Sequence, residues 1–287
     1  MDALAHTVPG GDLVELDDLL WVLHRLMGQA VYDFEFGQWF PCRRPYGRPR
    51  APSRPEKVVL RIGAVKDYEG VERALAQTGF ALINSRGEHL RATELPRWYP
   101  LLEDLTPKSL WFEGPPDPVA ISEELGWPVF MKGARQTHRH KRSHSFIDGP
   151  VALGRALAEY AQDPVLSWQD IVCRELVPLR PVEDPDPARI PSSFEFRTFW
   201  WKGTCVGIGR YWSAGLNYTL TGTEEQAALA IASEAARRVA VPFLVVDVAQ
   251  TAAGRWIVIE CNDGQESGYA GVSPMGLWNA VLDLERP

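Results

Sequence analysis

Three oxygen-bearing side chains near the end of this 287-residue sequence are the strongest candidates for chemistry. Glu260 and Asn262 stand two residues apart where the apolar run WIVI ends, and Asp247 follows the apolar run FLVV. A buried carboxylate needs a partner, and carboxylate and amide oxygens are ligands that a hard cation such as Mg²⁺ prefers. The sequence therefore predicts a metal site at Asp247, Glu260 and Asn262. The alternative is that Asp247 caps a backbone group and Glu260 pairs with an arginine.

A β-hairpin is predicted to position these three side chains. If its turn is centred on residues 252–253, Asp247 lies opposite Val258. Because side chains alternate between the two faces of a strand, Asp247, Glu260 and Asn262 then share one face. Asp247 and Glu260 would be diagonal neighbours, with roughly 7–8 Å between their backbones. A cation between them would cancel the repulsion of the two carboxylates.

Basic residues at the ends of predicted strands are candidates for binding phosphate. The sequence has no GxxxxGK[ST] motif, and GIGRYW lacks the third glycine of a dinucleotide-binding fingerprint. Arginine offers a planar fork to phosphate oxygens, and lysine offers a compact charge. The candidates are Lys108, Lys132, Arg197 and Arg210. Each one alone could equally be an ordinary surface base.

Composition and charge narrow the classes of protein. Hydrophobic residues make up 45% of the sequence and charged residues 23%, as in ordinary soluble globular proteins. The formal net charge of −7 argues against a general affinity for nucleic acid or anionic membranes. No apolar run approaches the roughly 20 residues of a membrane-spanning helix, and the acidic N-terminus is unlike a signal peptide. Four scattered cysteines without a CxxC pair favour reduced thiols and a cytoplasmic location.

Hydrophobic periodicity predicts an α/β chain around these candidates. Residues 12–29 have helical spacing, and residues 41–57, with five prolines and five arginines, are predicted to be a connector or a docking surface for an acidic partner. The other predicted elements are a Rossmann-like strand–helix–strand unit over Val58–Ile62, Tyr68–Gln77 and Phe80–Ile83, a strand at Pro128–Lys132, a helix over 149–162, a strand within 167–179, a hairpin over 193–212 that turns at Lys202–Gly203, and a helix with Thr223 as its N-cap.

The order of these motifs resembles the ATP-grasp superfamily. The matching pieces are, in chain order, Lys108, the strand PVFMK that ends at Lys132, the strand DIVCRELVPL, the EFR motif with Arg197, and Asp247 with the ECN motif. The segment before them is similar to the region that precedes the ATP-grasp domain in a bacterial clade named for one arginine and two lysines, with Arg61 in the place of the arginine. ECNDGQ is similar to the ending of that clade. The resemblance covers roughly Val58 to Val281.

This resemblance implies a fold of two α+β lobes that hold ATP, preceded by a small Rossmann-like domain. The implied divisions are 1–57 for the N-terminal helix and Arg/Pro-rich linker, 58–105 for the domain before the ATP-grasp lobes, 106–177 for the N-terminal lobe, and 178–287 for the C-terminal lobe with the metal site. Two features depart from the clade. The first 57 residues lie outside the resemblance, and the second lysine is replaced by Arg139 in spacing while Lys141 matches in type.

The resemblance also implies roles for single residues. The backbone of Glu175, Leu176 and Val177 would read the adenine of ATP. Mg²⁺ would be held by Asp247, Glu260 and Asn262. The implied phosphate ligands are Lys108, Lys132, Arg139 and Lys141, and the implied catalytic residues are Lys132, Arg197 and Arg210. The implied activity is a ligase that phosphorylates a carboxylate and joins it to an amine, releasing ADP and phosphate. Its partners would be small-molecule or peptide carboxylates and amines, and a second copy of the chain in a homodimer is a further candidate.

Other interpretations stay open at the level of sequence. The ATP-binding residues would serve a kinase equally well, and a non-catalytic nucleotide-binding protein also fits. Zinc at His138, His140 and His144 is disfavoured because the basic residues around them repel a dication. The 11 tryptophans could stack nucleic-acid bases, but most lie in apolar segments. The basic loop 133–145 is expected to be open without nucleotide and to close over the phosphates of ATP.

Overall fold

The computed structural model describes residues 56–61, 63, 65–77, 79–135, 142–183, 190–212 and 215–285, together with the backbone of three earlier strands. β1 (Ala5–Thr7) pairs with β2 (Leu13–Glu15), and β3 (Val31–Asp33) pairs with a later strand. The helix predicted over residues 12–29 is therefore wrong at β2, because pairing with another strand overrides local helical spacing. The rest of that segment, and the Arg/Pro-rich segment as far as residue 55, lie outside the described residues.

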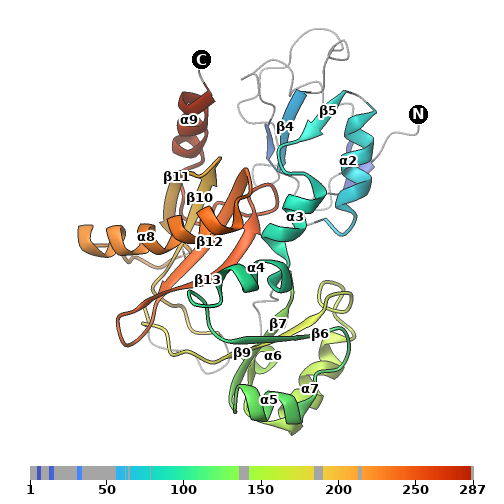
Figure 1. Ribbon diagram of the computed structural model, residues 1–287, viewed down its shortest axis with the longest axis vertical. Coiled ribbons are helices and arrows are strands. Elements are labelled where there is room, and N and C mark those ends of the chain that lie inside the picture. Colours follow the sequence, from blue (N-terminus) through green and yellow to red (C-terminus); the bar gives the residue numbers. More distant parts are fainter. Residues whose placement is uncertain are drawn as a thin grey trace.

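A four-stranded antiparallel sheet forms the C-terminal lobe and carries the metal candidates (Figure 1). Its strands, in spatial order, are β11 (Thr204–Arg210), β10 (Glu195–Trp201), β12 (Phe243–Gln250) and β13 (Trp256–Asp263). The predicted turn at Lys202–Gly203 is confirmed, and both residues have positive φ angles there. The helix α8 (Gly222–Val239) packs small alanine side chains against one face, and α9 (Pro274–Glu285) packs against the other face.

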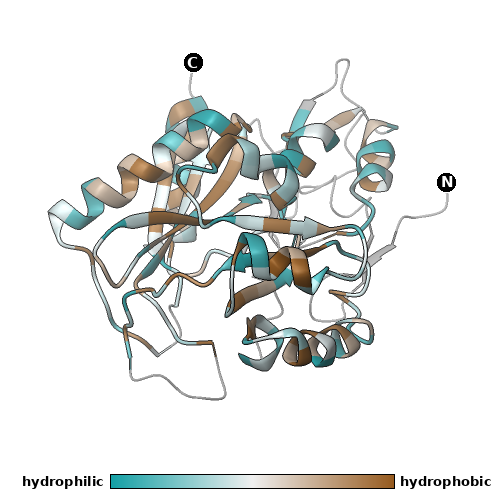
Figure 2. Ribbon diagram, turned by 60° about the horizontal axis from the view of Figure 1, so that its bottom comes forward, coloured by the Kyte–Doolittle hydropathy of each residue, from teal (hydrophilic) through white to brown (hydrophobic). Residues whose placement is uncertain are grey.

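The start of α8 differs from the predicted one. Thr221 is the N-cap, and its hydroxyl accepts a hydrogen bond from the backbone N–H of Glu224 at 3.3 Å. The Glu224 carboxylate in turn accepts from the backbone N–H of Thr221 at 2.8 Å. Thr223 was wrong as the predicted N-cap because the glutamate that completes this reciprocal capping box stands three residues after Thr221. Figure 2 shows hydrophilic and hydrophobic residues alternating along α8, as expected for a helix with one buried face.

A second four-stranded sheet forms the N-terminal lobe. Its strands, in spatial order, are β6 (Ser109–Phe112), β9 (Ile171–Glu175), β7 (Val129–Gly133) and β8 (Phe146–Ile147). The helices of this lobe are α5 (Pro118–Glu124), α6 (Arg142–Ser145) and α7 (Pro150–Tyr160). Ile121 of α5 and Leu153 of α7 share a buried cluster with Met131 of β7. This core fixes β7, which carries Lys132.

The predicted strand–helix–strand unit is confirmed ahead of these lobes. β4 (Glu56–Arg61) pairs in parallel with β5 (Phe80–Leu82), and α2 (Tyr68–Ala76) connects them. Two short helices, α3 (Arg86–Thr93) and α4 (Leu95–Leu102), then lead to the N-terminal lobe. In Figure 1, α3 and α4 lie between the β4–β5 unit and the two lobes. No helix among the described residues is long and apolar enough to cross a membrane.

Asn84, directly after β5, ties this N-terminal unit to the C-terminal lobe. Its buried side-chain amide accepts from the backbone N–H of Phe243 at 2.9 Å and donates to the Phe243 carbonyl oxygen at 2.8 Å. The same amide donates to Oδ1 of Asp263 at 2.8 Å. His89 Nδ1 lies 3.0 Å from Oδ2 of Asp263, and the His89 ring stacks on Tyr68 with ring centroids 3.8 Å apart. These contacts join the first residue of β12 and the last residue of β13.

The residues after β13 extend these contacts. Gln265 donates its backbone N–H to Asp263 Oδ1 at 2.8 Å and its side-chain amide to the Tyr68 hydroxyl at 2.6 Å. Glu266 accepts from the backbone N–H of Val65 at 2.9 Å, and burial raises the pKa of this carboxyl to about 7. We call the group consisting of Asn84, His89, Asp263, Gln265 and Glu266 the anchor cluster.

Candidate nucleotide and metal site

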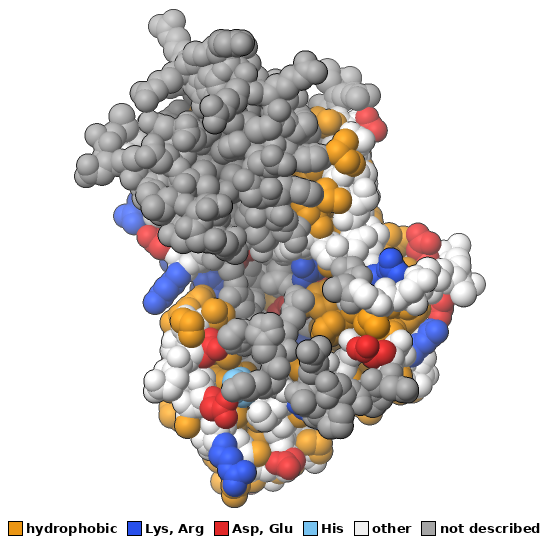
Figure 3. All heavy atoms as spheres, turned by 180° about the vertical axis from the view of Figure 1, so that it is seen from behind, with side chains coloured by type: hydrophobic (Ala, Val, Ile, Leu, Met, Phe, Trp, Pro, Cys, Tyr) orange, Lys and Arg blue, Asp and Glu red, His pale blue; other side chains and the backbone are white. Residues whose placement is uncertain are grey.

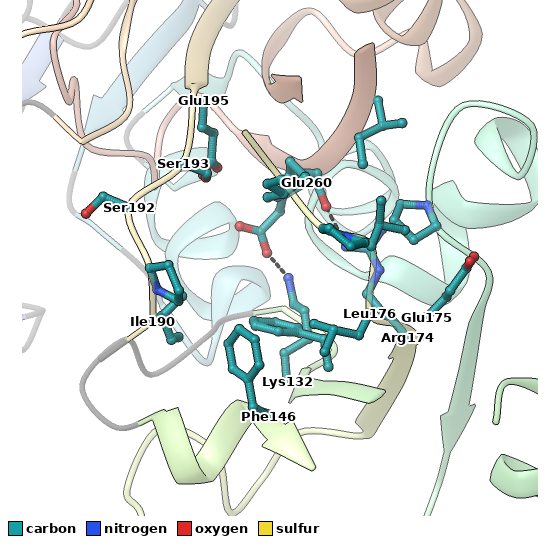
Figure 4. A pocket seen from close by; sticks show the side chains of 18 of the residues that line it. Lys132, Phe146, Arg174, Glu175, Leu176, Ile190, Ser192, Ser193, Glu195 and Glu260 are labelled. Atoms are coloured by element: carbon teal, nitrogen blue, oxygen red, sulfur yellow. Dashed lines mark hydrogen bonds and ion pairs between the residues drawn. The ribbon is translucent and has the colours of Figure 1, made fainter. Parts of the chain in front are cut away.

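A cavity of about 540 Å³ is lined by both lobes and by the segment between them. Phe130 and Lys132 enter from β7, Ile257 and Glu260 enter from β13, and residues 174–179 join the two sides. Figure 4 shows the side chains converging, with Lys132 directed at Glu260. The volume lies within the roughly 300–1,000 Å³ of small-molecule sites, and the lining is mostly apolar, as such sites usually are.

The segment after β9 exposes backbone groups to this cavity. Glu175, Leu176 and Val177, the residues predicted to read adenine, all line the cavity wall. Glu175 donates its backbone N–H to the Lys108 carbonyl oxygen at 2.8 Å, which holds the end of β9. Within the described chain, no hydrogen-bond partner is found for the backbone groups of Leu176 and Val177. Such groups are available to a ligand that presents its own donors and acceptors.

Lys132 and Glu260 form an ion pair across the cavity between the two lobes. Both side chains are largely shielded from solvent, with exposed fractions of 4% and 16%. Burial opposes the ionisation of Glu260, but the charge and hydrogen bond of Lys132 outweigh it, so the pKa of Glu260 lies below its ordinary value. Asn262 adds a hydrogen bond to the Glu260 carboxylate. Glu260 is therefore held as an anion next to an exchangeable cation.

Arg197 and Asp247 form the second ion pair of the site. The guanidinium donates from Nε and Nη2 to the two carboxylate oxygens of Asp247, at 2.9 and 2.8 Å. Its Nη1 donates to the Gly268 carbonyl oxygen at 2.8 Å, and the group lies 5.0 Å from the centre of the Tyr211 ring. A bidentate, hydrogen-bonded pair of this kind is a rigid unit.

The register of the hairpin differs from the predicted one. Asp247 lies directly opposite Glu260, rather than opposite Val258. Val248 pairs with Val258, so Ile259 is an extra residue in β13 and forms a β-bulge. The hairpin is centred one residue later than predicted, which alone would turn Glu260 to the other face, and the bulge turns it back. The prediction that Asp247 and Glu260 share a face is confirmed, with a closer approach than expected.

These donors fit a hard divalent cation. Asp247 and Glu260 face each other on neighbouring strands, and Asn262, paired with Val245, lies on the same face. All three offer oxygen, and Mg²⁺ commonly takes one or two carboxylates and completes its shell with water and phosphate. Among the described residues, no group of three or more His, Cys, Asp or Glu side chains could hold a metal ion. The set is thus incomplete without further oxygen ligands.

Several predicted residues lie elsewhere. Lys108 binds Glu124 through its side chain at 2.7 Å on the surface, and its side chain does not line the cavity. Arg210 donates to Asn217 Oδ1 at 2.7 Å and is also outside the lining. Arg139 and Lys141, and with them most of the basic loop, lie outside the described residues. The structure therefore brings together Lys132, Glu260 and the interlobe segment, with Arg197 and Asp247 beside them.

His144 was one of the residues considered for zinc. Its Nε2 contacts the carboxylate of Glu159, and the imidazole packs edge-on against Tyr160. His138 and His140 lie outside the described residues. The neighbouring Arg142 lies over the Phe146 ring at 4.0 Å, and both side chains line the cavity. The described end of the basic loop thus supplies an arginine, rather than a histidine, to the site.

Two cavity residues were missed from the sequence. Arg174 of β9 is buried and donates to Ser109 Oγ at 3.1 Å and to the carbonyl oxygen of the bulge residue Ile259 at 2.7 Å. Burial lowers the pKa of Arg174 to about 10. Glu195 is also buried, and accepts from Trp212 Nε1 at 3.1 Å. A charged residue within an apolar strand was visible at both positions, but not its direction.

Comparisons with known proteins agree with this geometry. A model of the ATP-grasp domain, for family 3 of the clade named for one arginine and two lysines, matches residues 97–281. A search of curated proteins gives no match. Among solved structures, a RimK domain ATP-grasp protein from Sphaerobacter thermophilus is similar at 14% identity and a TM-score of 0.54, covering 82% of this chain and 84% of that chain.

Two ligases are also similar in structure. D-alanine–D-alanine ligase from Bacillus anthracis, solved with ATP, has 12% identity and a TM-score of 0.58, covering 79% of this chain and 78% of that chain. The ATP-grasp ligase PsnB, solved with a minimal precursor, Mg and ADP, has 17% identity and a TM-score of 0.50, covering 81% and 79%. At these identities the likeness supports the fold alone. Because the family model spans most of the chain and the two-lobed fold agrees with it, the protein belongs to the ATP-grasp domain family numbered 3 in the clade named for one arginine and two lysines.

Proposed function

We propose that the protein is an ATP- and Mg²⁺-dependent ligase that joins a carboxylate to an amine through an acylphosphate, releasing ADP and phosphate. One observation carries the proposal. Lys132 from one lobe meets Glu260 from the other at a cavity that the interlobe backbone also lines. Cationic and carboxylate groups at one end of an apolar cavity suit a ligand with an apolar base and a charged tail.

Each part of the cavity has a proposed role. The backbone of Glu175, Leu176 and Val177 would bind the adenine edge, and apolar side chains of both lobes would cover its faces. Lys132 would bind phosphate oxygens, and Arg142, which also lines the cavity, is positioned to assist. The proposed roles of Lys108, Arg139 and Lys141 at the phosphates would need these side chains to approach from outside the described cavity lining.

The metal end would act on the transferring phosphoryl group. Asp247, Glu260 and Asn262 would hold Mg²⁺, which supplies charge neutralisation at the β- and γ-phosphates when bound. Arg197 would orient Asp247 through its two-pronged contact and stabilise negative charge nearby. Arg210 would join it only after leaving Asn217. The substrate carboxylate oxygen then attacks the γ-phosphorus, and an amine nitrogen later attacks the acylphosphate carbon and displaces phosphate.

The domain division and the cellular setting follow from the same proposal. The two sheets correspond to lobes at 106–177 and 178–287, with the unit at 58–105 before them, and the reaction suits a cytoplasmic enzyme because ATP is made available there. Nucleic acid is not a proposed partner. On the face seen in Figure 3, Lys and Arg side chains of the described residues are interspersed with Asp and Glu, and do not form the continuous basic surface that nucleic acid binds.

The experiment is to incubate the protein with ATP, Mg²⁺ and pools of carboxylates and amines, and to measure ADP and new masses together. A ligase should release ADP only when both pools are present and should form amide masses. With hydroxylamine in place of the amines it should form hydroxamates, which trap the acylphosphate. Phosphorylated products without amides would identify a kinase instead. Absence of nucleotide binding would contradict both activities.

A further inference from the structure

Both proposed metal carboxylates already have a cationic side chain as partner. Glu260 is paired with Lys132, and Asp247 is paired with Arg197. None of the four side chains is more than 16% exposed to solvent. Their charges cancel in pairs, so the nucleotide-free site has little net negative charge with which to attract a free divalent cation.

The two pairs differ in how firmly they are held. Arg197 makes two bonds to Asp247 and a third to the Gly268 carbonyl oxygen, which a cation at Asp247 need not break because each carboxylate oxygen has a second lone pair. Lys132 has Glu260 as its one partner in the described chain. Its ammonium can donate three hydrogen bonds and stands on a flexible four-carbon stem. Lys132 is thus the partner that can be exchanged.

Exchange requires a new partner for Lys132. A cation that took Glu260 by itself would leave the ammonium of Lys132 buried and unpaired, which is strongly unfavourable. A nucleotide phosphate removes that obstacle, because it gives Lys132 an anion and gives the metal further oxygen ligands at the same moment.

We propose that Lys132 makes metal binding conditional on nucleotide: it neutralises Glu260 in the nucleotide-free protein, moves to phosphate when nucleotide enters, and so releases Glu260 to the cation. The site then selects the metal–nucleotide pair over free metal. This inference rests on the proposed function, since it assumes that nucleotide phosphates reach Lys132.

Mn²⁺ is the probe, measured as protein-bound ion by water-proton relaxation at matched free Mn²⁺, with and without ADP. For the wild-type protein, ADP should raise Mn²⁺ affinity at least tenfold. Lys132→Gln, which removes the charge, should bind Mn²⁺ alone at least tenfold more tightly than the wild type, while ADP adds little. Lys132→Arg keeps the charge and should keep Mn²⁺ alone weakly bound.

Lys202→Gln is the matched control. It removes a lysine from an ion pair with Glu285 at the surface of the C-terminal lobe, away from the cavity, and should behave as the wild type does. Thermal unfolding of each variant reports whether it is folded. If Lys132→Gln does not fold, the wild-type measurements with and without ADP still decide the matter.

The outcomes separate two kinds of failure. Equal Mn²⁺ affinity of the wild type with and without ADP would overturn the inference, as would a folded Lys132→Gln that binds Mn²⁺ no more tightly than the wild type. If the wild type does not bind ADP at all, in the presence or absence of Mn²⁺, the proposed function fails first. A tighter Mn²⁺ site in Lys132→Gln would then still support the exclusion of metal by Lys132.

Discussion

Glu260 and Asp263 are three residues apart on β13, but their carboxylates have opposite surroundings. Glu260 faces the cavity and meets Lys132, a flexible cation from the other lobe. Asp263 is fully buried on the side of α3, where Asn84, His89 and the backbone after the strand supply its hydrogen bonds. The first carboxylate can change partner, whereas the second has each oxygen already bound.

This difference divides the polar stretch ECNDGQESG into two parts. Alternation along the strand sends Glu260 and Asn262 to the cavity, while Cys261 joins the core beneath α8. The residues that follow, Asp263 and Gln265, hold the N-terminal unit. Carboxylates placed side by side in sequence thus serve ligand binding in one case and domain attachment in the other. A carboxylate with one exchangeable partner is the better candidate for a ligand site.

The largest expected effect is on turnover from the cavity side. Asp247→Asn combined with Glu260→Gln keeps the side-chain shapes but removes both charges, and we expect ADP formation to fall by at least about 10³-fold. ADP release in a coupled assay measures it, and circular dichroism checks that the fold is intact. The control is Asp104→Asn with Glu234→Gln, two carboxylates that pair with Arg238 on the surface and should leave turnover unchanged. Unchanged turnover in the first double variant would sink the metal assignment.

The next effect is on stability from the anchor side. Asp263→Ala leaves Asn84 and His89 without their shared acceptor in a fully buried position, and should lower the free energy of unfolding by about 3–5 kcal/mol. Glu260→Gln should cost less, because Lys132 borders a cavity that water can enter. Urea unfolding of both variants measures the contrast. Equal losses would mean that the two carboxylates do not differ in the way proposed.

Glu266 allows a test through pH. Burial raises its pKa to about 7 in the folded protein, whereas an unfolded chain titrates glutamate near pH 4.3. Between these values the folded protein binds more protons than the unfolded chain, so this group makes stability decrease as pH rises to about 7, with no further change above. Glu266→Gln cannot ionise and should gain about 3 kcal/mol relative to the wild type between pH 4.5 and 8.

Urea unfolding at a series of pH values measures this gain. Glutamine can still accept from the backbone N–H of Val65, so the comparison isolates the charge. A difference between the two proteins that stays constant with pH would show that Glu266 is ionised in the folded state, and would remove it from the buried side of the comparison.

A smaller effect is expected at Gly264, which joins Asp263 to the rest of the anchor cluster. A Cβ atom there would lie 2.6 Å from the Phe243 ring, so Gly264→Ala should cost about 1–3 kcal/mol of stability. Gly87→Ala in α3 is the control, because its Cβ would meet nothing within 4 Å and alanine favours a helix. Thermal unfolding measures both. Nucleotide affinity should remain that of the wild type, and a selective loss of affinity would contradict the separation of the two sides.

Local patterns were enough to predict most of the elements. The unit around α2, the turn at Lys202–Gly203 and the ATP-grasp fold are confirmed, because periodicity and motif order are properties of the chain itself. The Rossmann-like character of the N-terminal domain stays a prediction. The errors lie where two local signals competed. Thr221 and Thr223 are both suitable N-caps by type, and β2 lies in a stretch with helical spacing.

The sequence by itself determined which residue types gather at the end of β13, which family the chain resembles and which faces its strands would bury. Only the tertiary structure decided the partners. Lys132 and Glu260 are 128 residues apart in sequence, and Asn84 and Asp263 are 179 apart, so each pair exists because separate units pack together. The bulge at Ile259, which sets the direction of Glu260, likewise depends on pairing with β12. Local periodicity determines the face of a strand that a side chain occupies, but packing between sheets determines what it meets there.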